Sequence, residues 1–113
     1  MKKVKVAIYC RISPFADELT LTRLCEVQKS VLIEKATASN FEVVDCYADV
    51  GYAGDDPQRP DLQRLLQDYV SGKFAIVLVI NKDRLIKGNY QKMPKLPFPI
   101  LSAQPMSKVE YER

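Results

Sequence analysis

Apolar residues are concentrated in three short runs along the chain, and each run is typical of a β-strand. The runs span residues 4–10, 41–48 and 74–80. The first two are mostly apolar and contain β-branched valines, which favour strands. The third is apolar at every position, a pattern typical of a central parallel strand that is covered on both faces.

Two segments between these runs repeat their apolar residues at helical spacing. The first extends from about residue 21 to 38, with Thr20 as the expected N-cap and Ser39-Asn40 closing the helix. The second follows Pro60, a residue suited to a first helical turn, and should end at Gly72. The expected core-facing residues of the two helices are Leu21, Leu24, Cys25, Val31, Leu32, Leu62, Leu65, Leu66, Tyr69 and Val70.

The order strand, helix, strand, helix, strand predicts an α/β fold. Because crossover connections between parallel strands are right-handed, we expect an open, mostly parallel sheet with flanking helices and the strand order 2-1-3. At 113 residues the chain has room for one domain. We assign residues 1–88 to the βαβαβ core. Residues 89–113 hold four of the seven prolines and should be irregular, with one short extended piece around Ile100-Leu101.

The residue types that are missing or scarce exclude several classes of protein. The chain contains no histidine, which excludes a Ser-His-Asp triad and most zinc sites. Three widely spaced cysteines, Cys10, Cys25 and Cys46, lie in apolar segments and are interpreted as reduced core thiols. No apolar run approaches the roughly 20 residues of a membrane span, and no signal-peptide cleavage site follows the basic N-terminus. We therefore expect a cytoplasmic protein without a membrane partner.

The small net charge of +3 is unevenly distributed along the chain. Residues 1–81 contain ten Lys/Arg and eleven Asp/Glu, whereas residues 82–113 contain seven and three. The basic excess therefore lies in the C-terminal third, which is compatible with a polyanionic partner and equally with a solvated tail.

The most informative polar residues follow the predicted strands. Open parallel sheets bind ligands beyond the carboxyl ends of their strands. Arg11 and Ser13 follow the first strand, Asp49 the second, and Asp83 and Arg84 the third. Arginine suits a phosphate because its planar guanidinium donates paired, charge-assisted hydrogen bonds. The set predicts a site for an anionic group with a serine available to attack it, although polar residues also crowd strand ends simply because loops are solvated.

Gln28 is a polar residue on the apolar stripe of the first predicted helix, four residues from both Leu24 and Leu32. A polar side chain facing a core needs a partner. Two interpretations remain open: the amide caps a nearby backbone group, or it reaches the site at the edge of the sheet.

Other ligand-binding motifs are missing. The chain has no phosphate-binding P-loop, no Gly-x-Gly-x-x-Gly and no visible metal cluster. A receiver-like signalling domain needs an acidic pair after the first strand, where this chain has Arg11.

Five motifs in register resemble the catalytic domain of the serine site-specific recombinases, the resolvase/invertase family. Tyr9, Arg11 and Ser13 are spaced as in the Tyr-x-Arg-x-Ser motif that opens these domains, and Gln28 matches the glutamine of their first helix. The loop at 49–54 (DVGYAG) with the helix start at 59–66 (RPDLQRLL) resembles the family's acidic-glycine loop and arginine-led second helix. The segments at 72–74 (GKF) and 82–85 (KDRL) complete the resemblance, which covers about residues 4–88.

The resemblance implies a resolvase-like fold and a reaction. Ser13 would attack a DNA phosphodiester and form a phosphoserine linkage, while Arg11 and Arg84 would hold the phosphate. Asp83 would take part in proton transfer or orientation. The supporting residues would be Tyr9, Gln28, Asp49, Arg59 and Lys87. No metal or other cofactor is implied, because the covalent intermediate retains the bond energy. The partner would be DNA, with a homo-oligomer in the intact family and a place in a mobile element.

Two departures from the family pattern affect this expectation. After Asp-Arg-Leu the family has a small residue and an arginine, where this chain has Ile86 and Lys87, and lysine lacks the bidentate fork. The family also continues with another strand, a long dimerisation helix and a DNA-binding domain, which residues 90–113 do not resemble. The function predicted is site-specific DNA recombination, impaired or incomplete in this chain. The alternative is a non-catalytic remnant or interaction module that binds a recombinase or another protein.

Overall fold

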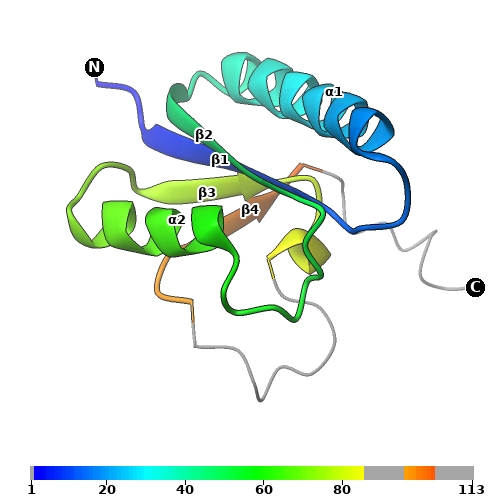
Figure 1. Ribbon diagram of the computed structural model, residues 1–113. Helices are drawn as coiled ribbons and strands as arrows, with labels where there is room; N and C mark the ends of the chain where they lie inside the picture. Colours follow the sequence, from blue (N-terminus) through cyan, green and yellow to red (C-terminus); the bar gives the residue numbers. More distant parts are fainter. Residues whose placement is uncertain (1, 86–95, 104–113) are drawn as a thin grey trace, which may run out of the picture.

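The computed structural model describes residues 2–85 and 96–103. Their elements, in chain order, are β1 (Lys5–Ile12), α1 (Glu18–Ala38), β2 (Glu42–Val50), α2 (Pro60–Val70), β3 (Ile76–Val79), the 3-10 turn η1 (Lys82–Arg84) and β4 (Ile100–Ser102) (Figure 1). No helix within these ranges is both long and apolar enough to cross a membrane.

The strands form one open sheet in the order β2-β1-β3-β4, and every neighbouring pair is parallel. The predicted fold class and the predicted order 2-1-3 are confirmed. The two helices cover opposite faces of the sheet (Figure 1). Right-handed crossovers require this arrangement. Helix α1 connects β1 to β2 on one side of β1, and α2 leads back from β2 to β3 on the other side, so the two connections run in opposite directions. The change of direction between β1 and β3 creates a crevice at their carboxyl ends.

Each face of the sheet has its own core. The α1 face includes Ile8, Cys10, Leu21, Cys25 and Leu32. The α2 face includes Tyr9, Tyr47, Leu62, Leu65 and Phe74. Successive side chains of β1 alternate between the two cores, as the two-residue period of a strand requires. All three cysteines are free, Cys10 and Cys25 buried and Cys46 half-buried.

Helix α1 begins earlier than the sequence predicted. Its N-cap is Asp17, whose Oδ2 accepts a hydrogen bond from the Thr20 backbone N–H at 3.1 Å and whose Oδ1 accepts one from the Thr20 hydroxyl at 2.6 Å. Thr20 was therefore wrongly placed at the cap. Both residue types can fill that position, and only the backbone geometry decides which of them does.

The predicted core-facing residues of the helices are partly wrong. Leu24 and Val31 are 40% and 46% exposed, and Val70 is 81% exposed. The buried residues of α1 are Leu21, Cys25, Gln28, Leu32 and Ala36. Apolar residues therefore occupy two adjacent stripes of α1, of which only one packs on the sheet.

Part of the C-terminal segment that was predicted to be irregular belongs to the sheet. Ile100–Ser102 form β4, where the sequence indicated only a short extended piece, and Phe98 is buried in the α2-face core. The prolines conceal this strand in the sequence, but β4 lies at the sheet edge, where a missing N–H is tolerated. The Pro99 carbonyl still accepts a hydrogen bond from the Val77 N–H at 2.9 Å. The predicted boundary at residue 88 lies outside the described residues.

An ion network attaches α2 to β2 and thereby positions the residues at the start of α2. Asp45 Oδ2 lies 3.1 Å from Arg64 Nη1 and 2.8 Å from Lys73 Nζ. The Arg64 guanidinium also stacks 3.9 Å from the centroid of the Tyr47 ring. The hydrogen bond from Lys73 is the largest of the effects that lower the pKa of Asp45.

This lowered pKa predicts a loss of stability in acid. A carboxyl whose pKa is lower in the folded state stabilises the fold above its unfolded pKa of about 3.9, and the contribution is lost as the pH falls through the folded pKa. Asp45→Asn should therefore lower the urea midpoint of unfolding at pH 7. It should also reduce the difference between the midpoints measured at pH 7 and at pH 3. Asp55→Asn, an exposed carboxylate in the loop before α2, is the matched control. An unchanged difference in Asp45→Asn would contradict the prediction.

Candidate active site

The carboxyl ends of β1 and β3 bring together three residues that the sequence singled out. Arg11 is the second-to-last residue of β1, and Ser13 follows the strand directly. Arg84 ends η1, just after β3. Arg11 is fully buried, whereas Ser13 and Arg84 are half-buried. The site therefore lies at the carboxyl ends of the parallel strands.

The Arg11 guanidinium is hydrogen-bonded directly to the Ser13 hydroxyl. Its Nη1 donates to Ser13 Oγ at 2.7 Å and to the Tyr52 carbonyl at 3.0 Å. Its Nε donates to the Arg84 carbonyl at 3.1 Å. A permanent positive charge that donates to the hydroxyl oxygen stabilises negative charge developing there. One side chain thus positions Ser13 and connects the end of β1 with η1.

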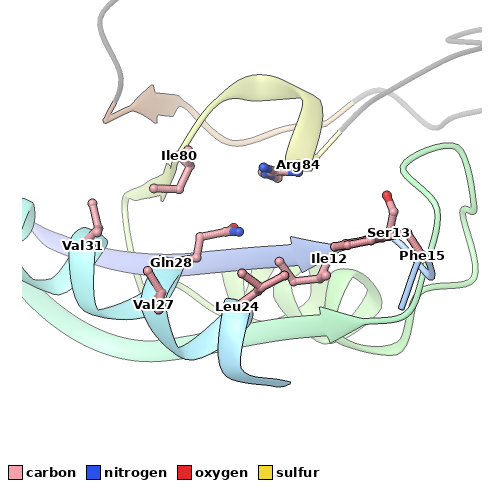
Figure 2. A pocket seen from close by; sticks show the side chains of 9 residues that line it. All are labelled: Ile12, Ser13, Phe15, Leu24, Val27, Gln28, Val31, Ile80 and Arg84. Atoms are coloured by element: carbon pink, nitrogen blue, oxygen red, sulfur yellow. The ribbon is translucent and has the colours of Figure 1, made fainter. Parts of the chain in front are cut away.

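Arg84 and Ser13 both line one cavity (Figure 2). The side-chain Nε of Arg84 is buried and has no hydrogen-bond partner in the structure. Unpaired buried donors are rare, because an unsatisfied polar group costs free energy. An anion that hydrogen-bonds to this N–H would satisfy it.

Gln28 satisfies both interpretations that its sequence position left open. Its side chain is 8% exposed, and its Oε1 accepts a hydrogen bond from the Arg11 backbone N–H at 3.3 Å. The same side chain also projects from α1 into the cavity (Figure 2). Gln28 therefore caps a backbone group of β1 and borders the site.

The cavity has a volume of about 420 Å³. Its polar groups are Ser13 just after β1, Gln28 of α1 and Arg84 of η1, and the rest of its wall is apolar. The residues that line it are Ile12, Ser13, Phe15, Leu24, Val27, Gln28, Val31, Ile80 and Arg84. The sequence pattern did not predict this apolar wall. Helical spacing places Leu24 and Val31 with the core residues and gives no separate signal for Val27.

Asp49 and Tyr9 lie behind the site and do not line the cavity. The Asp49 carboxylate accepts hydrogen bonds from the Tyr9 hydroxyl at 2.7 Å, the Asp61 N–H at 2.9 Å and the Leu62 N–H at 3.0 Å. The last two donors belong to the first turn of α2, which Asp49 therefore caps from β2. Burial raises the pKa of Tyr9 well above that of an ordinary phenol, so the hydroxyl remains a donor.

Arg59 is fully buried and connects two backbone segments and the side chain of Tyr9. Its Nη1 donates to the Arg84 carbonyl at 2.9 Å and to the Tyr9 hydroxyl at 3.2 Å. Its other nitrogens donate to the carbonyls of Gly54, Asp56 and Leu85. Arg59 therefore holds η1, and with it Arg84, against the loop before α2.

The remaining predicted residues cannot be placed in the site. The backbone of Asp83 lies in η1, but its side chain is outside the described part of the chain, and so is Lys87. Within residues 2–85 and 96–103, no three Cys, Asp or Glu side chains are arranged to hold a metal ion.

Several solved structures of recombinases have the same fold. The N-terminal catalytic domain of TP901-1 integrase is 34% identical, with a TM-score of 0.64, and covers 78% of this chain. The C-terminal catalytic domain of ISC1926 TnpA, an IS607-like serine recombinase, is 23% identical over 95% of this chain and 74% of its own, with a TM-score of 0.74. A resolvase family site-specific recombinase from Streptococcus pneumoniae is 23% identical over 97% and 82%, with a TM-score of 0.67. The last two structures are similar to this chain in fold alone.

The parallel sheet, its two helices and the serine-arginine edge thus define a resolvase-type catalytic domain. Residues 6–93 match the family described as Resolvase, N terminal domain, and the chain belongs to that family. It spans 62% of the length of the TP901-1 catalytic domain. No curated protein matches the chain.

Proposed function

We propose that this chain performs the DNA strand cleavage and rejoining of serine recombinases, with Ser13 as the nucleophile. Its family implies site-specific recombination. The Ser13 oxygen attacks the phosphorus of a DNA phosphodiester, and the bond to one deoxyribose oxygen breaks. The Ser13 hydroxyl gives up its proton, the departing deoxyribose oxygen takes up a proton and leaves as a hydroxyl, and a phosphoserine diester remains. Attack by another deoxyribose hydroxyl reverses the step and rejoins the strand.

The observation that carries the proposal is the hydrogen bond between Arg11 Nη1 and Ser13 Oγ at a cavity that Arg84, with its unpaired Nε, also lines. Arg11 stabilises charge on the attacking oxygen. Arg84 binds the phosphate oxygens, on which negative charge gathers during transfer. Asp83 takes part in proton transfer or orientation, as the family resemblance implies.

Arg59, Asp49 and Tyr9 support this chemistry from behind the site. Arg59 and Arg11 both donate to the Arg84 carbonyl, so the backbone of Arg84 is restrained from two sides. Gln28 restrains the backbone N–H of Arg11. Preorganised donors need little rearrangement during the reaction, which is the main way that such sites accelerate it.

An NMR titration of the isotope-labelled chain with inorganic phosphate, followed by a short DNA duplex, tests the anion site. Phosphate should shift the resonances of Arg11, Ser13 and Arg84 first. Arg84→Gln should weaken phosphate binding about 10-fold, since it removes one charge-assisted interaction. Arg23→Gln changes an exposed arginine of α1 and should leave binding unchanged.

Shifts confined to other surfaces would contradict the catalytic proposal. They would favour the second function, an interaction module that binds a protein partner. The observation in its favour is the exposed apolar stripe of α1, on which Leu24, Val27 and Val31 are 40–61% exposed.

A further inference from the structure

The cavity beside Ser13 is part of a longer hollow along α1. A second cavity of about 450 Å³ shares Val31 and Ile80 with the first and extends to Ala103, just beyond β4. Helix α1 packs mainly on β1 and β2, so it covers less of this face of β3 and β4. The result is an elongated hollow with the anion-binding residues at one end.

The two ends of this hollow differ in chemistry. Ser13 and Arg84 supply a hydroxyl and a guanidinium at the sheet edge, and the guanidinium has an unpaired buried Nε. Beyond them the wall is formed by Leu24, Val27 and Val31 of α1 and by Ile80 after β3 (Figure 2). A DNA phosphate is flanked by sugars and further phosphates, which do not match such a wall.

We propose that the hollow binds small amphiphilic anions, namely phosphate monoesters or carboxylates that bear an aryl group or a short alkyl chain. The anionic head pairs with Arg84 beside Ser13, and the apolar body lies between α1 and Ile80. The volume is within the range of about 300–1,000 Å³ that is usual for small-molecule sites. The assignment of the anionic head to Arg84 beside Ser13 rests on the proposed function. The assignment of the apolar body to the wall between α1 and Ile80 does not.

Occupation of the hollow has a functional consequence. The head group occupies the position of the scissile phosphate, and it therefore excludes DNA from Ser13. A ligand of this class is a competitive inhibitor of strand cleavage, and its affinity depends on apolar contacts that DNA does not use.

A comparison of inorganic phosphate with phenyl phosphate tests the proposal, with dissociation constants measured by NMR titration of the full chain. Phenyl phosphate should bind about 10-fold tighter than phosphate, because burial of one ring face removes apolar area from water. It should also shift the methyl resonances of Val27, Val31 and Ile80, which phosphate alone should leave in place.

Val27→Ser tests the wall without disturbing the core, because Val27 is 61% exposed. It should reduce the advantage of phenyl phosphate over phosphate and leave the affinity for phosphate unchanged. Leu19→Ser is the matched control, since Leu19 is 58% exposed on α1 and does not line the cavity. It should leave both affinities unchanged.

The failures of the two proposals are distinguishable. Equal affinities for phosphate and phenyl phosphate, both with shifts at Ser13 and Arg84, would overturn the amphiphile site and leave the anion site intact. Binding of neutral phenol as tight as that of phenyl phosphate would overturn the role of Arg84. Phenyl phosphate that shifts only residues outside the hollow would overturn the inference as a whole.

Discussion

Ser13→Ala should abolish formation of a covalent phosphoserine adduct. The hydroxyl that Arg11 contacts at 2.7 Å is the proposed nucleophile, and alanine has no atom to replace it. Bis(4-nitrophenyl) phosphate is a suitable substrate, because its activated leaving group removes the need for the target DNA site. Attack by the Ser13 oxygen releases 4-nitrophenolate, and the hydroxyl proton passes to water.

The adduct is measured by mass spectrometry of the intact chain and of the peptide that contains Ser13. Unmodified protein should gain one 4-nitrophenyl phosphoryl group, whereas Ser13→Ala should gain none. Ser30→Ala removes an exposed hydroxyl of α1 and should leave the adduct unchanged. Lys87→Arg restores the residue that the family carries at that position and should not reduce adduct formation. An adduct that survives in Ser13→Ala would show that another residue is the nucleophile.

Arg59→Met should destabilise the fold by about 3–5 kcal/mol, because a buried acceptor that loses its donor costs about 1–3 kcal/mol and several acceptors lose theirs at once. The guanidinium is fully buried and donates to the carbonyls of Arg84, Leu85, Gly54 and Asp56 and to the Tyr9 hydroxyl. Methionine fills much of the volume but leaves these acceptors without their donor. Such a loss is a large fraction of the roughly 5–15 kcal/mol by which domains are stable.

Urea unfolding measures this loss, with Arg23→Met as the matched control on the exposed side of α1. Arg59→Lys extends the test if the methionine variant fails to fold. A lysine ammonium keeps the charge but cannot reach the acceptors on both backbone segments and the Tyr9 hydroxyl at once, so an intermediate loss is expected. A variant Arg59→Met as stable as the control would contradict the structural role of Arg59.

Most of the fold could be predicted from the sequence because its signals are local. The apolar run at 74–80 contains β3, and Pro60 marks the first turn of α2. Gly72 has a φ of +84°, a conformation that glycine adopts without strain, and it ends α2 as expected. The site residues at strand ends followed from the rule for open parallel sheets once the strands were assigned.

The errors concern choices that local sequence leaves open. Asp17 and Thr20 are both good caps, and Leu24 and Val31 are as apolar as the core residues beside them. A strand next to prolines is also concealed, because only its place at the sheet edge makes a missing N–H tolerable. The choice of cap, the burial of these apolar residues and the position of the strand each depend on which surface a neighbouring element covers.

The sequence by itself determined the parallel α/β architecture, the strand order and the approximate location of Ser13, Arg11 and Arg84. Periodicity and turn residues act over a few positions, and the handedness of crossovers then leaves few topologies. Only the tertiary structure decided that Arg11 contacts Ser13, that Arg59 is buried under η1, and that an apolar hollow adjoins the nucleophile. The hydrogen bond from Arg11 Nε to the Arg84 carbonyl joins residues 73 positions apart, and such geometry arises only when the sheet and both helices pack together.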